Sequence, residues 1–232
     1  MIAMHIPDGF IDGPTSLVAG LIAITAVAWC VRKTSETLSD RDIPVVGLAA
    51  AFIFAAQMLN FPVANGTSGH LLGGVLAAVL VGPYAGALAV TVVLVVQALL
   101  FADGGLSALG LNIVNMALAG SFAGYGLFLL LRKVFGRRSW AVTAAAGVAA
   151  FLVPIIASIV FTVEYAIGGN DAVPFATLAG AMIGVHTLIG IGEGIITGVA
   201  ISAVMSMRPD LVYGARDLQP NVVPATWQGV TP

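Results

Sequence analysis

The sequence predicts an all-α, polytopic transmembrane bundle of about seven helices, with the N-terminus outside the cell and the C-terminus in the cytoplasm. Only 9% of the residues are charged and 59% are apolar, whereas a soluble domain carries roughly 25% charged residues. The mean hydropathy is +1.04, and long apolar runs follow one another along the chain. All lysines and arginines lie between or after these runs, and their positions predict which side of the membrane each chain end occupies.

The apolar segments define the expected helices. In chain order these helices cover about 16–31, 43–60, 68–82, 84–101, 109–131, 139–163 and 178–206. The third and fourth come from a single run at 71–101, which would be roughly 46 Å long as one helix against a hydrocarbon core of about 30 Å. The Gly-Pro pair in "VGPYAG" predicts a break inside that run.

The basic residues support this division of the long run. They form three clusters, made of Arg32, Lys33, Arg41, Arg132, Lys133, Arg137, Arg138, Arg208 and Arg216. The positive-inside rule assigns all three clusters to the cytoplasm. An even number of crossings must therefore separate residue 42 from residue 132, and four crossings satisfy this condition where three do not.

The chain divides into three parts on this basis. Residues 1–15 form an external N-terminal segment without the basic region of a signal peptide, and 16–207 form the bundle. Residues 208–232 are rich in proline, glycine and polar side chains, so we expect an extended cytoplasmic tail. The single cysteine, Cys30, lies within an apolar run and is expected to be a small buried hydrophobe without a disulfide.

Small residues recur at helical spacing in several of the predicted helices. The sets are Gly74, Ala78 and Gly82, then Gly180 and Gly184, then Gly190, Gly194 and Gly198. Small residues at this spacing let helix backbones approach closely in lipid. Packing within the bundle and a docking face for another membrane subunit both remain open at this stage.

The chain opens with "MIAMHIPDGF", which places a histidine directly after a second methionine. If the mature chain begins at Met4, its first two residues offer three nitrogens in a row: the Met4 amine, the His5 amide and the His5 imidazole. Chelate rings draw such nitrogens toward one plane, and planar nitrogen sets suit Ni(II) and Cu(II). His70, in "GTSGH" on the same outer side, could supply a fourth nitrogen. The alternatives are a polar residue at a mobile chain end for His5 and a helix cap or interface anchor for His70.

Three blocks, "MHIPDGF", "GTSGHLLGG" and "QALLFADGGLSALGLNIVNMAL", resemble the CbiM/NikM family of cobalt and nickel transporters. Its members are the substrate-binding membrane subunits of energy-coupling factor (ECF) transporters in the cell membrane of prokaryotes. The blocks occur in the family's order, and the likeness runs from Met4 to about residue 206. The resemblance implies a helical bundle whose external N-terminus dips inward, with metal ligands at Met4, His5 and His70. The form of "GTSGH" places nickel slightly ahead of cobalt.

The sequence departs from the family at its start, because Met1, Ile2 and Ala3 precede Met4. This extension would turn the Met4 amine into an amide and would crowd a buried site. We expect translation to begin at Met4. Removal of the extension after translation, or a different binding mode, are the alternatives.

Further polar residues match the family's blocks and are expected to support the ligands. Asp103, Asn112 and Asn115 are expected to position the His70 loop through hydrogen bonds, as metal ligands usually require. The alternative is an interface turn with interhelical amide bonds. Thr67 and Ser68 are expected to form hydrogen bonds within the loop.

His186 and Glu193 are seven residues apart in the last predicted helix and so share a face. Ionisable groups inside a membrane are costly and usually face a cavity or a partner. We expect a buried hydrogen-bonded pair, or a contact to a coupling subunit, in preference to a metal ligand.

The expected function is capture of Ni(II) or Co(II) as a transported substrate, without a prosthetic group. The sequence has no G-x-x-x-x-G-K-[ST] motif, so ATP hydrolysis is expected on partners: ATPase subunits, a coupling membrane subunit and a small accessory membrane subunit. A stand-alone secondary transporter or channel is the alternative, which a test of ATP dependence would distinguish. An intramembrane enzyme that uses His186 and Glu193 is a remote alternative, because the sequence lacks the H-E-x-x-H motif.

Overall fold

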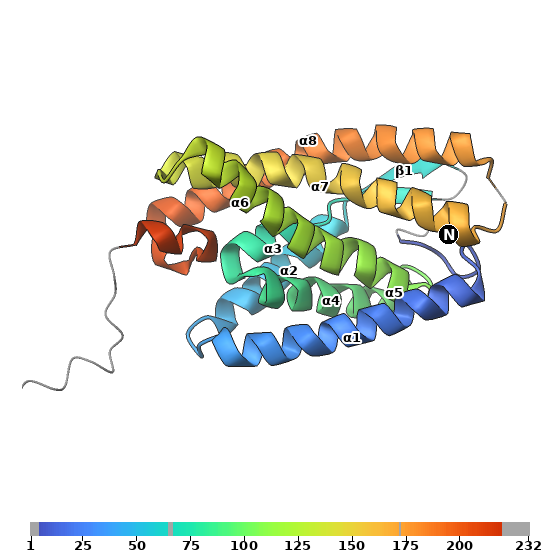
Figure 1. Cartoon of the computed structure of the whole chain (residues 1–232), viewed down its shortest axis with the longest axis horizontal. Helices are drawn as coiled ribbons and strands as arrows, with labels where there is room; N and C mark the ends of the chain where they lie inside the picture. Colours follow the sequence, from blue (N-terminus) through green and yellow to red (C-terminus); the bar gives the residue numbers. More distant parts are fainter. Residues whose placement is uncertain (1–4, 65–66, 172, 220–232) are drawn as a thin grey trace, which may run out of the picture.

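The computed structural model describes residues 5–64, 67–171 and 173–219, which form a bundle of antiparallel helices with a small sheet at one end (Figure 1). The helices are α1 (Gly13–Thr37), α2 (Ile43–Gln57), α3 (Gly74–Val81), α4 (Pro83–Leu100), α5 (Leu109–Asn112), α6 (Gly124–Phe135), α7 (Ser139–Gly168) and α8 (Phe175–Met207). A π-helical segment, η1 (Ile113–Ala123), joins α5 to α6 into one continuous rod.

The predicted all-α membrane bundle is confirmed. Within the described residues, α1, α4, the rod from α5 to α6, α7 and α8 are long and apolar enough to cross a membrane. The short apolar helix α2 and the eight-residue α3 complete the seven helical segments. The predicted break between the third and fourth segments is also confirmed, because Gly82 has a φ of +90° and Pro83 begins α4.

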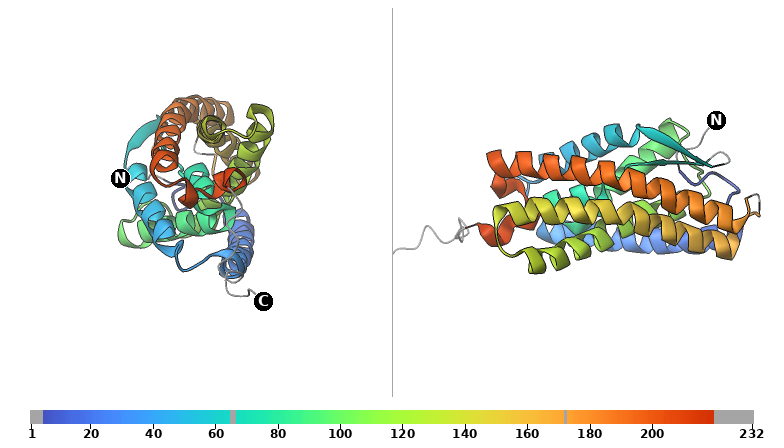
Figure 2. Two further views of the ribbon diagram at one scale, coloured as in Figure 1. Left: turned by 90° about the vertical axis from the view of Figure 1, so that its left-hand side faces the viewer. Right: turned by 90° about the horizontal axis from the view of Figure 1, so that it is seen from above.

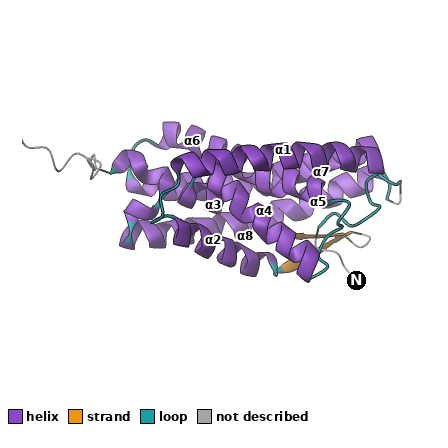
Figure 3. Cartoon of the chain, turned by 90° about the horizontal axis from the view of Figure 1, so that it is seen from below, coloured by secondary structure: helices purple, strands orange, loops and turns teal. Residues whose placement is uncertain are grey.

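The predicted helix over 68–82 is wrong in its first part. Strands β1 (Asn60–Ala64) and β2 (Thr67–His70) pair antiparallel, with Asn60 opposite His70, and α3 begins only at Gly74. Gly73, just before α3, has a φ of +77°, which favours glycine. Residues 68–70 belong to the hairpin, and residues 71–73 connect it to α3. The predicted helix therefore lacks its first six residues. Figure 3 shows the hairpin at the end of the bundle near the N-terminus.

The short helix α3 lies within the bundle and not on its surface. Val75, Ala77 and Ala78 are fully buried. The backbones pack so closely that a Cβ at Gly74 would lie 2.5 Å from the carbonyl carbon of Gly120 in η1. The small residues of α3 therefore serve packing inside the bundle, where the loop that carries His70 is attached.

Close backbone packing also joins α7 to α8, which run side by side (Figure 1). A Cβ at Gly194 would lie 2.8 Å from the carbonyl oxygen of Gly147, and a Cβ at Gly190 would overlap the carbonyl oxygen of Phe151. By contrast, nothing lies within 4 Å of a Cβ added at Gly198, and the same holds for Gly180 and Gly184. The small-residue pattern in α8 thus combines a packing face with an open face.

The chain beyond α8 does not extend away from the bundle, as we expected, but forms two short 3₁₀ helices. These are η2 (Pro209–Leu211) and η3 (Tyr213–Leu218), and Figure 2 shows them at the end opposite the sheet. Val212 and Ala215 are buried, and Asp217 lies 2.9 Å from the buried guanidinium of Arg132. An apolar anchor and an ion pair therefore hold this segment, while residues 220–232 of the predicted tail lie outside the described part.

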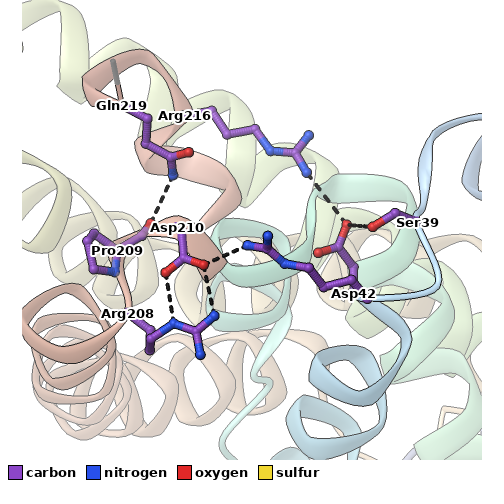
Figure 4. A network of polar contacts seen from close by, with 8 residues as sticks. Ser39, Asp42, Arg208, Pro209, Asp210, Arg216 and Gln219 are labelled. Carbon is purple, nitrogen blue, oxygen red and sulfur yellow. Dashed lines mark hydrogen bonds and ion pairs between the residues drawn. The ribbon is translucent and has the colours of Figure 1, made fainter. Parts of the chain in front are cut away.

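A second polar network ties the same segment to the turn between α1 and α2 (Figure 4). Asp210 accepts hydrogen bonds from Arg208 at 2.9 and 3.0 Å, and Arg216 lies 3.9 Å from Asp42. Ser39 donates to the same Asp42 carboxylate at 2.8 Å. These surface contacts fix where the last described turns of the chain lie.

Candidate metal centre

The N-terminal segment folds into the bundle and is held there by the 101–112 region. The Ile6 N–H donates to Asn112 Oδ1 at 3.1 Å, and the Ile6 carbonyl accepts from the Gly105 N–H at 2.9 Å. Two residues on, the Asp8 carboxylate accepts from the Ser107 N–H and hydroxyl at 2.8 and 2.6 Å. Both donations favour the ionised carboxylate and lower the pKa of Asp8. The backbone on either side of Pro7 is therefore fixed.

A second set of contacts fixes the N-terminal segment to the end of α7 and the connection between α7 and α8. The Asp12 N–H donates to the Gly168 carbonyl at 2.6 Å, and the Asn170 N–H donates to the Phe10 carbonyl at 3.2 Å. The Asp12 side chain also caps α1 by accepting from the Thr15 N–H at 2.9 Å. The chain between His5 and α1 thus runs as a strap from the 101–112 region to the α7–α8 connection.

His5 is buried at the inner end of this strap. Its Nδ1 lies 3.1 Å from Asp103 Oδ1 and 3.3 Å from the Asp103 carbonyl, while Nε2 has no hydrogen-bond partner among the described residues. Gly104 has a φ of +90°, and a Cβ there would lie 2.8 Å from the His5 Cβ. A glycine at this position lets the loop close on the imidazole.

His70 lies directly against His5. The two rings meet edge to face with their centroids 4.6 Å apart. His70 Nδ1 is 2.8 Å from the Leu71 carbonyl, which can only accept, so Nδ1 carries the proton and Nε2 keeps its lone pair. Burial is the main cause that lowers the pKa of His70 to about 3, and nearby His5 acts in the same direction. His70 is therefore neutral, which is the form that binds metals.

A cavity of about 70 Å³ opens beside the two rings. All three histidines of the chain line it, since His186 of α8 joins His5 and His70. Asn112, Asn115 and Met182 also contribute to the lining. The cavity is large enough for a metal ion together with a few water molecules.

The expected pair of His186 and Glu193 does not form. His186 Nδ1 lies 2.8 Å from the Met182 carbonyl in its own helix. Glu193 accepts instead from the backbone N–H groups of Leu72 and Gly73 at 2.8 and 2.9 Å. Seven residues span about 10.5 Å along a helix, which is too far for a direct hydrogen bond between the two side chains. Each of them bonds to backbone groups instead.

The two asparagines also differ from the expectation, because neither bonds to the described part of the His70 loop. Asn112 holds the N-terminal strap at Ile6, whereas Asn115 Nδ2 donates to Glu164 Oε2 of α7 at 2.6 Å. At this level the rod from α5 to α6 lies next to the strap and to α7. The Asn112 and Asn115 side chains therefore bond to these two neighbours. Asn115 thus makes the interhelical bond that was the alternative.

Two residues that the sequence analysis did not single out complete the surroundings. The Gln57 side chain is fully buried and donates to the Leu72 carbonyl at 2.8 Å, opposite the Glu193 contact. Glu164 receives the bond from Asn115. A lone amide or carboxylate within or at the end of an apolar run is the signal that could have identified both.

Three predicted residues lie wholly or partly outside the described part. Met4 is not described, and of Thr67 and Ser68 only the backbone, in β2, is described. Among the side chains that are described, no three His, Cys, Asp or Glu groups are arranged to hold one metal ion. A set of four nitrogens around one metal ion at this cavity would therefore have to include backbone or terminal nitrogens.

Comparison with known proteins identifies the family of the chain. The family model described as "Cobalt uptake substrate-specific transmembrane region" (CbiM) matches residues 5–211. The chain belongs to the CbiM family. It is accordingly a multi-pass membrane protein of a family that transports cobalt and nickel.

Named relatives of the chain point to the same family. A Haloquadratum walsbyi protein named for metal transport is 38% identical over 90% of this chain and 94% of its own. An Archaeoglobus fulgidus protein named as a fused nickel transport protein, NikMN, is 40% identical over 90% of this chain and 68% of its own. The cobalt transport protein CbiM of Thermosediminibacter oceani is 34% identical over 92% and 88%.

A solved structure described as a truncated transition metal transporter matches with a TM-score of 0.77 and 28% identity. The match covers 88% of this chain and 99% of that one. The shared fold therefore includes nearly the whole of that truncated chain.

Proposed function

We propose that this chain captures a divalent transition metal ion, nickel ahead of cobalt, at the outer face of the membrane for an ATP-driven ECF-type importer. One observation carries the proposal: all three histidines of the chain are buried around one small cavity, and a doubly anchored N-terminal strap lines it. Membership of the CbiM family supports the same substrate class.

The proposed ligands are the Met4 amine, the His5 amide and imidazole, and His70 Nε2. The His5 amide and ring can share a metal only through Nδ1, which closes a small chelate ring. Because Nδ1 faces Asp103 at 3.1 Å, the ring has to turn about its Cβ–Cγ bond when the metal binds. Four nitrogens near one plane favour Ni(II) over ions that prefer tetrahedral or oxygen-rich sites.

The strap gives the site its proposed mechanism. The metal loses its water shell to the nitrogens, and the anchored segment from Ile6 to Asp8 then separates it from the solution. His70 contributes a rigid, neutral ligand, because burial and the Leu71 contact fix its ring. Hydrolysis of ATP on partner ATPase subunits, transmitted by a coupling membrane subunit and supported by a small accessory membrane subunit, would reorient the loaded bundle.

Metal uptake by the complete transporter in proteoliposomes tests the proposal. Removing ligand His70 in His70→Ala should abolish ⁶³Ni uptake, whereas Thr25→Ala, at an exposed position on α1, should leave it unchanged. Uptake by the wild type should stop without ATP. Uptake driven by an ion gradient alone would favour a secondary transporter, and full uptake by His70→Ala would contradict the proposed site.

A further inference from the structure

His186 is the one histidine that the proposed ligand set does not use. It is 7% exposed, lies on α8 and lines the same cavity as His5 and His70. A polar group at this depth is costly unless it has a partner or a function. Its ring has a backbone partner on one side only.

The hydrogen bond of His186 determines which nitrogen is free to act. Nδ1 lies 2.8 Å from the Met182 carbonyl, so Nδ1 carries the proton of the neutral ring and Nε2 keeps the lone pair. Nε2 is therefore the ring nitrogen that can act as a ligand. An imidazole held by its Nδ1–H on a backbone carbonyl is a common arrangement of metal-binding histidines.

The free nitrogen of His186 lies beside the strand that carries His70. A Cβ at Gly69 would lie 3.3 Å from His186 Nε2 and 3.2 Å from Cε1. Ile189 Cδ1 would lie closer still, at 2.6 Å, so α8 packs its Ile189 and His186 side chains directly against Gly69, the residue preceding His70. Since His70 also keeps its lone pair on Nε2, two neutral imidazoles with available nitrogens border one small cavity.

The surroundings of His186 on the side away from the strap suit a transition metal. The thioether of Met182, one turn earlier on α8, is buried and lines the cavity, as does Met116 of η1. Imidazole and thioether are donors for late transition metals, whereas Mg²⁺ and Ca²⁺ require oxygen. Donors from the strap, from β2, from η1 and from α8 therefore line one cavity.

We propose that His186 Nε2 is an inner ligand that, together with His70 Nε2, receives the metal when the N-terminal nitrogens release it. This inference rests on the proposed function. In the exchange, the metal's bonds to the Met4 amine, the His5 amide and the His5 ring break, and a bond to His186 Nε2 forms. The amide nitrogen takes back a proton from water, and water completes the coordination of the ion.

The inner site can be isolated by removing the outer one. In a chain beginning at Met4, His5→Ala should still bind Cu(II), used as a probe, and electron paramagnetic resonance should count two imidazole nitrogens. Adding His186→Asn should leave one nitrogen and weaken binding by about tenfold or more. Asparagine can keep the donation to Met182 while it removes Nε2, so loss of binding would not reflect loss of that contact. Thr187→Ala, at the adjacent exposed position, is the matched control and should change neither value.

The outcomes separate the inference from the proposed function. If His5→Ala binds no copper, or binds it equally with and without His186, the inner site does not exist, whatever the wild type does. If the unmodified Met4 chain binds neither Ni(II) nor Cu(II), the proposed function itself fails. In the complete transporter, the single variant His186→Asn should lower ATP-driven nickel uptake at least about tenfold, whereas Thr187→Ala should take up nickel as the wild type does. Unchanged uptake by His186→Asn would overturn the relay role.

Discussion

Glu193 is a buried carboxylate that forms hydrogen bonds with backbone groups far away in the sequence. It accepts from the N–H groups of Leu72 and Gly73, and Gln57 donates to the Leu72 carbonyl from the other side. These two backbone N–H groups come just before α3, where no helical partner exists. His70, the proposed ligand, lies only two residues before Leu72, so its position depends on α8.

The removal of this carboxylate should therefore affect both stability and metal capture. Glu193→Ala leaves two buried N–H groups without partners, at about 1–3 kcal/mol each. We expect a clear fall in the unfolding temperature in detergent and at least about tenfold weaker Ni(II) binding, with Glu193→Gln intermediate because it keeps one acceptor.

Glu36→Ala is the control for that measurement. Its carboxylate pairs with Arg32 and Lys33 at the surface of α1, and such pairs contribute about 0–1 kcal/mol. Stability and nickel affinity should both stay near wild type. If Glu193→Ala behaved in the same way, the coupling of α8 to His70 would be contradicted.

For individual residues, the sequence predicted which side chains lie close together but not all of their hydrogen-bond partners. His5, His70, Asp103 and Asn112 could be grouped because they lie in three blocks with a recognisable order. The contacts of Glu193 and Gln57 could not, since a backbone N–H or carbonyl more than ten residues away leaves no mark in the side-chain pattern. The sequence left an interhelical bond open as the alternative for Asn115, but it could not identify Glu164 as the partner because that side chain is on a different helix.

Among the elements, α8 contacts α7 through glycines on one side only. Gly190 and Gly194 lie against the backbone of α7, whereas Gly198 faces open space. The two positions therefore offer the same substitution in opposite surroundings. Spacing alone predicts both as contacts, and only the structure separates them.

Gly190→Ala and Gly198→Ala should accordingly differ in stability. At Gly190 the new methyl group overlaps the Phe151 carbonyl oxygen, and overpacking of this kind costs about 1–3 kcal/mol. At Gly198 the methyl group meets nothing, and alanine favours the helix by up to about 1 kcal/mol. Unfolding temperatures of the two purified variants check this, and equal values would contradict the packing of α7 on α8.

The third predicted helix shows why element boundaries were harder to predict than their order. Hydropathy placed a helix over 68–82, and its inner part exists as α3. Its outer part pairs with β1 as a hairpin, and Gly73 takes a left-handed conformation. Apolar composition does not distinguish a buried helix from a buried turn, so the glycines were the better guide.

For the whole molecule, the fold has two distinct ends. The strap, the hairpin and the 101–108 loop lie at one end, and η2 and η3 lie at the other (Figure 2). Five of the described helices are long and apolar enough to cross a membrane, and α2 and α3 are shorter. The orientation that the basic clusters predict assigns the strap end to the outside.

Cysteine labelling in intact cells tests this orientation. The wild type should not react, because Cys30 is fully buried. In a Cys30→Ala background, Leu106→Cys, at an exposed position beside the strap, should react with a membrane-impermeant maleimide added outside. Ser139→Cys, at the start of α7, should react only after the cells are permeabilised, and the reverse pattern would invert the topology.

The central claim, that an N-terminal nitrogen set captures the metal, is tested most directly by the position of the first residue. Two chains, one beginning at Met1 and one at Met4, are purified in detergent, verified by intact mass, and titrated with Ni(II) and Co(II) by calorimetry and visible absorption. We predict tight nickel binding with a square-planar d–d band for the Met4 chain, and binding at least about tenfold weaker for the Met1 chain. Equal affinity and equal spectra would show that the Met4 amine is not a ligand and would contradict the proposed capture site.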